Sequence, residues 1–306
     1  MLLSIFSTVC LPIVLTAGAG WSLDRLFRLD LRTLVKLNIQ LLIPAFLFVR
    51  LVSSELQFSA GIQIAGFTLA MIAALAIAGW LFSRLFGLPP AQRKSFQLAT
   101  AFYNCGNFGI PVMMLAFPGT GPVIQAFVLM TMNLTTFTAG VLLAHGESGN
   151  AATPKWRTVL SQPSLSAIAA ALLVKSLGLA AAVQSVVAIW KPLSFFADGL
   201  VPIALLTLGV QLSHAPALPL RGPLLAAVLT KLCMAPALAA LLVALFSVPA
   251  ETAAILIVGT AAPTAVNTAL LVHEYGDGDS SFVSAAVFYS TVLSAATVAV
   301  VLSLLR

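Results

Sequence analysis

The chain has 306 residues, of which 60% are hydrophobic and 8% are charged, and its mean hydropathy is +1.06. A soluble domain carries roughly 25% charged residues. The composition therefore excludes a soluble globular protein and predicts an all-α polytopic membrane protein with lipid as its solvent. The net charge of +6 does not indicate nucleic-acid binding, because the basic residues cluster in the short loops of one membrane side.

No motif in the sequence predicts an enzyme or a cofactor site. Cys10, Cys105 and Cys233 are scattered through apolar runs, which is typical of small buried residues and not of a disulfide framework or a metal site. The sequence contains no Ser-His-Asp set, no metal-ligand spacing and no Walker motif. We therefore expect neither enzyme activity nor a bound cofactor or metal.

The long apolar segments predict ten transmembrane helices, because a helix needs about 20 apolar residues to cross a bilayer. The first is not read as a signal peptide, since no Lys or Arg precedes its apolar core. A shorter segment, Ala180–Trp190, is predicted to lie along the membrane interface. The ten predicted spans are Leu2–Gly20, Leu34–Val52, Ala60–Phe86, Ser95–Phe117, Pro122–Ala144, Trp156–Leu177, Ser194–Leu212, Pro223–Phe246, Thr252–Tyr275 and Ser280–Leu305.

Basic residues are concentrated in the loops after spans 1, 3, 5 and 7, whereas the opposite loops carry little beyond Arg50, Lys175 and Lys191. The positive-inside bias places the first set in the cytoplasm and both termini outside. That first set comprises Arg25, Arg28, Arg32, Lys36, Arg84, Arg93, Lys94, Lys155, Arg157 and Arg221.

Short matches between the two halves indicate a repeat. "LFGLP" at 85–89 returns as "LFSVP" at 245–249, and "LIPAFLF" at 42–48 resembles "LVPIALL" at 200–206. Because each half has five predicted spans, an odd number, the second must enter the membrane inverted. The predicted organisation is a first five-helix repeat at 1–145, a cytoplasmic linker at 146–155 and an inverted repeat at 156–306.

The fourth span of each half contains residues that weaken a helix. "YNCGNFGIP" contains Asn104, Gly106, Asn107 and Pro111, and "AAPTAVN" contains Pro263, Thr264 and Asn267. The 160-residue offset of the loop match aligns Asn104 with Thr264 and Asn107 with Asn267. Proline removes a backbone donor, and unwound backbone at this depth is tolerated only inside protein or beside a wet cavity.

Paired interruptions of this kind predict a transporter's binding site. Each break would expose a half-helix N-terminus, and two such ends make a pocket suited to a carboxylate. The alternative is that these residues only kink continuous helices. Pro44 and Pro202, in the second span of each half, either bend helices beside the pocket or simply kink them.

Lys231 lies well inside the eighth span. A central lysine costs about 2.5–3.5 kcal/mol on insertion scales and usually faces a cavity or a partner. It is a candidate positive charge near the anion path, the alternative being a lysine that snorkels to the interface or binds helix carbonyls. Asp198 and Glu274 are predicted at shallow span ends. The lack of deep carboxylates argues against a proton relay or a sodium site and permits an anion uniporter.

These motifs resemble the auxin efflux carrier family, which includes the plant PIN carriers and bacterial PIN-like members of the bile/arsenite/riboflavin transporter superfamily. "IPAFLF" at 43–48 is similar to the family's second-span motif, "GNFGIPV" at 106–112 to the fourth-span motif, and "APTAVNTALLVHEYG" at 262–276 to the more specific ninth-span motif. The resemblance covers nearly the whole chain.

The resemblance implies crossing broken helices in spans 4 and 9, a scaffold and a transport domain, elevator-type alternating access and a homodimer in a bacterial inner membrane. It implies that Asn104 is the crossover asparagine and that Pro111 and Pro263 are helix-breaking prolines. Tyr103 stands where plant carriers have a proline, and their long cytoplasmic loop is absent.

The sequence thus predicts a secondary transporter of small organic anions such as carboxylates, auxin-like, malate-like or malonate-like. One alternative is a sodium-coupled organic-anion symporter of the bile-acid type, with Asn107, Thr264 and Asn267 as candidate ion ligands. The other is a channel or a membrane sensor that binds its ligand without translocating it.

Overall fold

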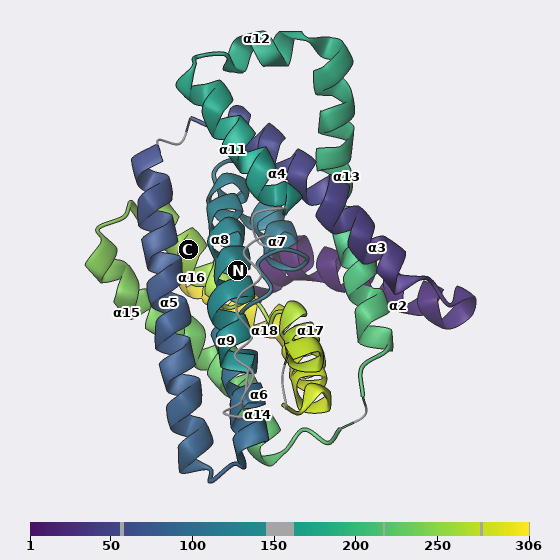
Figure 1. The fold of residues 1–306 in the computed structure, drawn as a ribbon, viewed down its shortest axis with the longest axis vertical. Helices are drawn as coiled ribbons and strands as arrows, with labels where there is room; N and C mark the ends of the chain where they lie inside the picture. Colours follow the sequence, from purple (N-terminus) through teal and green to yellow (C-terminus); the bar gives the residue numbers. More distant parts are fainter. Residues whose placement is uncertain (56–57, 145–161, 217, 276–277, 306) are drawn as a thin grey trace.

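The computed structural model describes residues 1–55, 58–144, 162–216, 218–275 and 278–305, and these residues are helical except for connecting loops and one isolated β-bridge (Figure 1). In the first half the elements are α1 (Leu2–Ile5), the π-helical turn η1 (Phe6–Cys10), α2 (Leu11–Phe27), α3 (Leu31–Leu37), the π-turn η2 (Asn38–Leu42), α4 (Ile43–Val52), α5 (Phe58–Leu85), α6 (Pro90–Ala101), α7 (Gly109–Ala116), α8 (Gly121–Thr135), the π-turn η3 (Thr136–Gly140) and α9 (Val141–Ala144).

The second half has the same helical character. Its elements are α11 (Pro163–Ser176), α12 (Ala180–Ser185), α13 (Val187–Ser213), α14 (Gly222–Leu229), the π-turn η4 (Thr230–Met234), α15 (Ala235–Phe246), α16 (Ala250–Thr260), α17 (Asn267–Tyr275) and α18 (Ser280–Leu305). The predicted linker at 146–155 and the start of the predicted sixth span lie outside the described residues.

Seven helical runs in the described residues are long and apolar enough to cross a membrane, so the chain is an all-α polytopic membrane protein. The other three predicted spans do not appear as long helices, because the fourth and ninth are interrupted and the sixth is described only from residue 162 onwards. The seven runs are Leu2–Phe27, Leu31–Val52, Ser59–Leu85, Gly121–Ala144, Val187–Ser213, Gly222–Phe246 and Ser280–Leu305.

Two predicted boundaries in the second half are wrong. Residues 187–190 do not belong to an interfacial helix, because α12 ends at Ser185 and α13 begins at Val187. Asp198 therefore lies inside α13 and not at its start, and its carboxylate pairs with Arg50 of α4 at 3.2 Å. The sequence prediction failed here because hydropathy alone does not separate one apolar helix from the next.

Prolines follow three of the four π-turns in the described residues. Pro12, Pro44 and Pro236 are each the second residue of the α-segment after η1, η2 and η4. A proline in a regular helix removes one hydrogen bond and clashes with the carbonyl four residues earlier. The residue just before each proline bonds instead to the carbonyl five residues back. The turn before each proline thus contains one extra residue, and the helix continues past the proline.

The helices form two groups that pack mainly within themselves. In one group α2 and α4 pack against α13, and α11 packs against α4. The other group contains α5, α6, α8, α15, α16 and α18. In Figure 1, α2, α3 and α13 lie on the right, and α5 and α15 lie on the left. The interface between α2 and α13 is close because it contains Gly20 and Gly209.

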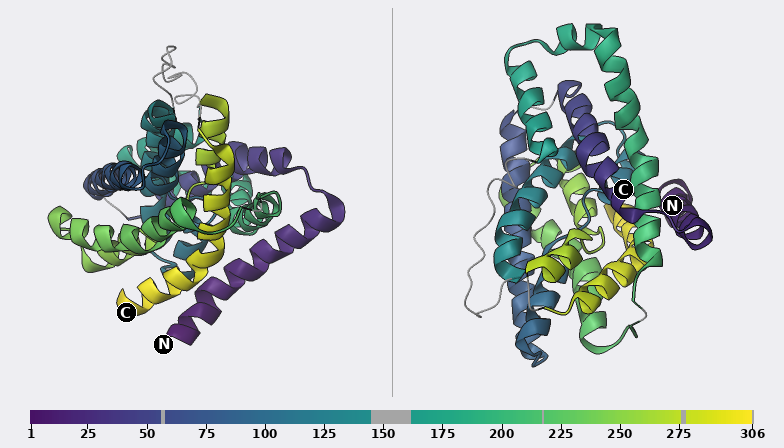
Figure 2. Two further views of the ribbon diagram at one scale, coloured as in Figure 1. Left: turned by 90° about the horizontal axis from the view of Figure 1, so that it is seen from below. Right: turned by 45° about the vertical axis from the view of Figure 1, so that its right-hand side comes forward.

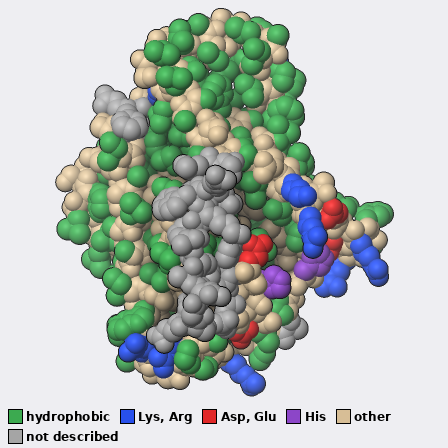
Figure 3. All heavy atoms as spheres, in the orientation of Figure 1, with side chains coloured by type: hydrophobic (Ala, Val, Ile, Leu, Met, Phe, Trp, Pro, Cys, Tyr) green, Lys and Arg blue, Asp and Glu red, His purple; other side chains and the backbone are tan. Residues whose placement is uncertain are grey.

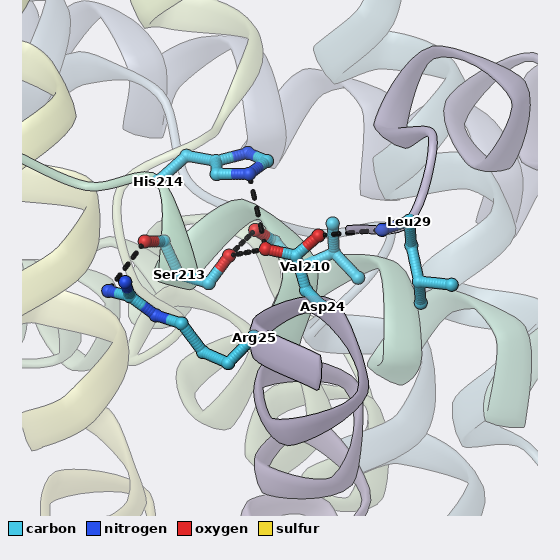
Figure 4. Close-up of polar contacts among 6 residues, drawn as sticks. All are labelled: Asp24, Arg25, Leu29, Val210, Ser213 and His214. Atoms are coloured by element: carbon cyan, nitrogen blue, oxygen red, sulfur yellow. Dashed lines mark hydrogen bonds and ion pairs between the residues drawn. The ribbon is translucent and has the colours of Figure 1, made fainter. Parts of the chain in front are cut away.

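A buried carboxylate joins the ends of α2 and α13 (Figure 4). Asp24 is 5% exposed and accepts hydrogen bonds from the Ser213 hydroxyl and from the Leu29 backbone N–H at 3.0 Å. His214 Nε2 lies 3.1 Å from the same carboxylate, and Arg25 donates to the Ser213 carbonyl at 3.2 Å. The sequence prediction ended the first span at Gly20 and so placed Asp24 in a loop, whereas the helix continues to Phe27.

The matched loops of the two halves have the same backbone form. Gly87 and Ser247, which are 160 residues apart, both adopt positive φ angles of 62° and 46°. Pro89 and Pro249 follow them as extended N-caps of α6 and α16, with ψ angles of 154° and 149°. The sequence match between these loops therefore reflects a real structural equivalence.

The two ends of the chain lie next to each other, because α1 packs against α18 (Figure 2). The upper lobe in Figure 3, formed by α11, α12 and the start of α13, shows many hydrophobic side chains and almost no charged ones on the visible face. Most Lys and Arg side chains visible in that view lie in the lower half of the molecule. Exposed apolar side chains in such numbers are expected for helices that face lipid.

Candidate functional site

Two helices are interrupted, and their interruptions cross. Residues 102–108 separate α6 from α7, and residues 261–266 separate α16 from α17. The two segments pair as an antiparallel bridge between Tyr103 and Thr264. The Asn104 N–H donates to the Pro263 carbonyl at 2.7 Å, and the Ala265 N–H donates to the Phe102 carbonyl at 3.1 Å. The prediction that both segments lose their helical hydrogen bonds is confirmed.

The register of the crossing differs by one residue from the sequence alignment. The loop match aligns Asn104 with Thr264, but the bridge pairs Tyr103 with Thr264. The first break has seven residues and the second has six. The extra residue follows the bridge in the first half, where residues 105–108 form turns before α7 begins.

Buried polar side chains hold the crossing in place. The Thr264 hydroxyl donates to the Ala99 carbonyl at 2.8 Å, and the Thr264 N–H donates to the Ser290 hydroxyl at 3.0 Å. From α8, Gln125 Nε2 donates to the Cys105 carbonyl at 2.7 Å. Thr264 is 1% exposed, so it supports the crossing and does not face a ligand. The sequence analysis missed Gln125 and Ser290, although both are polar residues in apolar spans.

Each break leaves backbone donors at the start of a half-helix. The N–H groups of Gly106 and Asn107, just before α7, make no hydrogen bond within the described part of the chain. The same holds for Val266 and Asn267 at the start of α17. Helix N-termini carry a partial charge of roughly +0.5 each. Two of them therefore supply a positive potential at one place without any charged side chain.

A cavity of about 310 Å³ lies against the crossing. Its other walls come from α3, η2 and α4, from α8 and η3, and from α11 and α13. The described residues that line it carry no charged side chain, and eight of them are amides: Asn38, Gln40, Asn104, Asn107, Asn133, Gln162, Gln211 and Asn267. A neutral, amide-rich cavity binds its ligand through hydrogen bonds and helix dipoles.

The structure brings only some of the predicted site residues to this cavity. Asn104, Gly106, Asn107 and Asn267 line it. The remaining candidates, which are Pro44, Pro111, Pro202, Lys231, Pro263 and Thr264, are not among its described lining residues.

The prolines have structural positions. Pro263 lies in the second break and accepts a hydrogen bond across the crossing. Pro111 does not interrupt a helix, because it is the third residue of α7. A proline is tolerated in a first turn, where its missing N–H has no partner. Pro44 follows η2, and Pro202 is exposed on α13. Neither residue is among the described residues that line the cavity.

Lys231 lies behind the crossing, in η4. Its side chain is fully buried at 0% exposure, and its Nζ lies 4.6 Å from the centroid of the Tyr103 ring. The Nζ makes no hydrogen bond among the described residues. Lys231 therefore neither snorkels to an interface nor binds a helix carbonyl. Tyr103 separates it from the cavity, since Tyr103 is itself a lining residue.

Five cavity amides were missed by the sequence analysis: Asn38, Gln40, Asn133, Gln162 and Gln211. Each lies in or beside an apolar predicted span, which was the available signal. Helix-breaking residues do not single these amides out, because four of them lie on helices and Gln162 precedes Pro163 at the start of α11.

A comparison with protein families matches residues 6–155 to a family described as membrane transport protein. The matched region includes the first interrupted helix and nearly all of the first half of the chain. No curated protein matches the chain. The matched family consists of transporters and not of enzymes, in agreement with several apolar helices long enough to span a membrane. The first half of the chain is therefore similar to a family of membrane transport proteins, in agreement with the resemblance to the auxin efflux carrier family. Together with the apolar helices, this match identifies an integral membrane protein.

Proposed function

We propose that this protein is a secondary transporter of small organic anions and that its substrate binds in the cavity at the crossing. The observation that carries the proposal is the convergence of two half-helix N-termini on one uncharged cavity. The two ends together supply about one positive charge, which matches one carboxylate. The amides around it hydrogen-bond the rest of a small ligand.

The proposal includes a ten-span arrangement of two inverted five-helix repeats. At 1.5 Å per residue, α6 with 12 residues and α7 with 8 together span about 30 Å. The pair α16 and α17, with 11 and 9 residues, gives the same length. This length equals the hydrocarbon thickness of about 30 Å. Each interrupted pair is therefore long enough to cross the membrane once.

The proposed mechanism is alternating access of the elevator type. The cavity lies between the group containing α4, α11 and α13 and the group that carries the crossing. Movement of the second group against the first would carry a ligand bound at the crossing from one side of the membrane to the other. We further propose a homodimer in a bacterial inner membrane with both termini outside, on the basis of the family and the basic loops.

Uptake by proteoliposomes tests the transport proposal. We expect saturable uptake of labelled carboxylates that falls at least ten-fold in Asn104→Ala, which removes a cavity amide, and in Pro263→Ala, which lets the second break return to a helix. Gln63→Ala is the matched control, because Gln63 is exposed on α5 and should leave uptake unchanged.

Three outcomes would change the assignment. Full uptake by both Asn104→Ala and Pro263→Ala would place the site elsewhere. Uptake that requires sodium, and is lost when choline replaces it, would favour the sodium-coupled symporter. Flux that does not saturate with substrate concentration would indicate a channel.

A further inference from the structure

The orientation of one cavity amide is fixed by its neighbour. Asn38, in η2, is 2% exposed and borders the cavity. Its Nδ2 donates to Thr207 Oγ1 of α13 at 2.9 Å, and that hydroxyl donates to the Ile203 carbonyl at 2.7 Å. A hydroxyl has one hydrogen to donate. Because this hydrogen bonds to Ile203, the hydroxyl can only accept from Asn38, which fixes the amide with its NH₂ group toward Thr207.

The carbonyl oxygen of the same amide has no hydrogen-bond partner in the part of the chain that the structure describes. Asn38 Oδ1 is buried and accepts no hydrogen bond among the described residues. Gln211 Oε1, also from a cavity residue on α13, is buried and unpartnered in the same way. Leaving a buried acceptor unsatisfied costs about 1–3 kcal/mol. Two such acceptors beside one cavity indicate that a molecule bound in the cavity donates hydrogen bonds to them.

The crossing provides hydrogen-bond donors to the cavity, unlike η2 and α13, which provide the two buried acceptors. Among the described residues, the N–H groups of Gly106, Asn107, Val266 and Asn267 at the crossing have no acceptor, and neither does Asn104 Nδ2. Among the described residues that line the cavity, the unpartnered backbone N–H groups and the unpartnered side-chain donor therefore lie at the crossing, and the buried unpartnered side-chain acceptors lie on η2 and α13. A simple carboxylate satisfies the donors alone. A ligand that satisfies both walls carries an acceptor at one end and a donor at the other.

We propose that Asn38 selects organic anions that also carry an O–H or N–H group at the end away from the carboxylate. The carboxylate binds the half-helix N-termini, and the ligand's donor binds Asn38 Oδ1. This inference rests on the proposed function and narrows its substrate class. Asn38 acts as a specificity residue, and Thr207 acts as a positioning residue because it bonds to Asn38 and is not among the described residues that line the cavity.

Matched ligand pairs test the inference by equilibrium binding to the purified full-length protein. One pair is 4-hydroxyphenylacetate and 4-methylphenylacetate, and the other is 4-hydroxybutanoate and pentanoate. In each pair a hydroxyl is replaced by a methyl group of similar size. We expect the wild type to bind the hydroxyl member of at least one pair ten-fold or more tightly, because the methyl analogue leaves the buried acceptor unpaired.

Two variants assign that preference to Asn38. Asn38→Leu should reduce it to two-fold or less, mainly by improving binding of the methyl member. Thr207→Val leaves Asn38 in place but removes the acceptor that orients it, so the preference should fall to an intermediate value. Gln63→Leu, on the exposed face of α5, should keep the full preference. If Asn38→Leu fails to fold, Thr207→Val still tests the inference.

Other results overturn the inference. Equal binding of both members of both pairs by the wild type contradicts it while leaving the transport proposal intact. A preference that survives in both Asn38→Leu and Thr207→Val assigns the discrimination to other residues. If no carboxylate binds at all, the organic-anion assignment fails and the inference fails with it.

Discussion

Lys231 is the residue whose role is least explained by packing. Its ammonium group is fully buried, contacts the face of the Tyr103 ring and forms no hydrogen bond among the described residues. A cation–π contact contributes roughly 0.5–2 kcal/mol, less than the desolvation cost of a buried charge. Because a buried charge without a compensating partner weakens a fold, we propose that Lys231 is retained for an electrostatic effect on the neighbouring cavity.

Lys231→Met should separate that effect from stability. For a separation on the order of 10 Å and an effective dielectric constant of about 20, the Coulomb energy is roughly 1.7 kcal/mol. We therefore expect carboxylate affinity to fall by about ten-fold or more, measured by equilibrium binding. Thermal unfolding in detergent should show stability that is unchanged or higher, since the variant removes an unpaired buried charge.

Lys191→Met is the control for this change, because Lys191 is exposed on α13 and the same charge is lost. It should leave binding unchanged. If Lys231→Met unfolded the protein at lower temperature but bound carboxylates as the wild type does, Lys231 would be a structural residue.

At the scale of single residues, the sequence indicated several residues that line the cavity, but it did not predict their hydrogen-bond partners. Asn104, Asn107 and Asn267 were predicted at the cavity and lie there, because asparagines within a few residues of glycine or proline mark a break. Thr264 was predicted with them, but its hydroxyl bonds to Ala99 instead. Asn38 was not predicted, because only its contact with Thr207 in the folded chain orients the amide so that its oxygen has no partner among the described residues.

At the scale of helices and turns, the features set by local sequence were predicted, whereas the features set by packing were not. Both interruptions were predicted, since Gly, Asn and Pro act on their own backbone. The π-turns before Pro12, Pro44 and Pro236 were not, because a proline in a sequence specifies a disturbed helix and not the form of the disturbance. Helix ends also follow packing partners, which is why α2 continues past Gly20 to the Asp24 contact with α13.

The α2–α13 interface predicts unequal effects of two neighbouring glycines. A Cβ at Gly20 would lie 2.3 Å from the Leu206 carbonyl oxygen, whereas a Cβ at Gly18 meets nothing within 4 Å. Gly20→Ala forces the helix backbones apart, and overpacking of this kind costs about 1–3 kcal/mol. Gly18→Ala only replaces glycine by a better helix former, a gain of up to about 1 kcal/mol.

Thermal unfolding of the two variants in detergent measures this difference. We expect Gly20→Ala to unfold at a clearly lower temperature than the wild type and Gly18→Ala at the same or a higher temperature. Equal midpoints for both variants would show that α2 and α13 are not packed this closely.

At the scale of the whole molecule, the two halves resemble each other in sequence most clearly where backbone geometry demands particular residues. The loops at 85–89 and 245–249 match because each needs a left-handed residue followed by an extended proline. The helices between them match poorly, because any apolar residue can face lipid. The one-residue register difference at the crossing arises where the two halves touch each other, and such a contact leaves no local sequence signal.

The crossing of the membrane by each interrupted pair is a prediction about the whole molecule that cysteine labelling can check. In a background with Cys10, Cys105 and Cys233 replaced by alanine, single cysteines are introduced by Arg84→Cys, Gly119→Cys, Ser185→Cys and Arg221→Cys. Arg84 lies at the end of α5, and Gly119 lies between α7 and α8. If α6 and α7 together cross the bilayer, these two positions lie on opposite sides.

With a membrane-impermeant maleimide on intact spheroplasts, we expect Gly119→Cys and Ser185→Cys to react at once. Arg84→Cys and Arg221→Cys, in the basic loops, should react only after the membrane is permeabilised. Labelling of Arg84→Cys and Gly119→Cys from the same side would mean that α6 and α7 enter the membrane and turn back. The cavity would then open to one side through a re-entrant loop, and a carrier built on two inverted repeats would no longer be tenable.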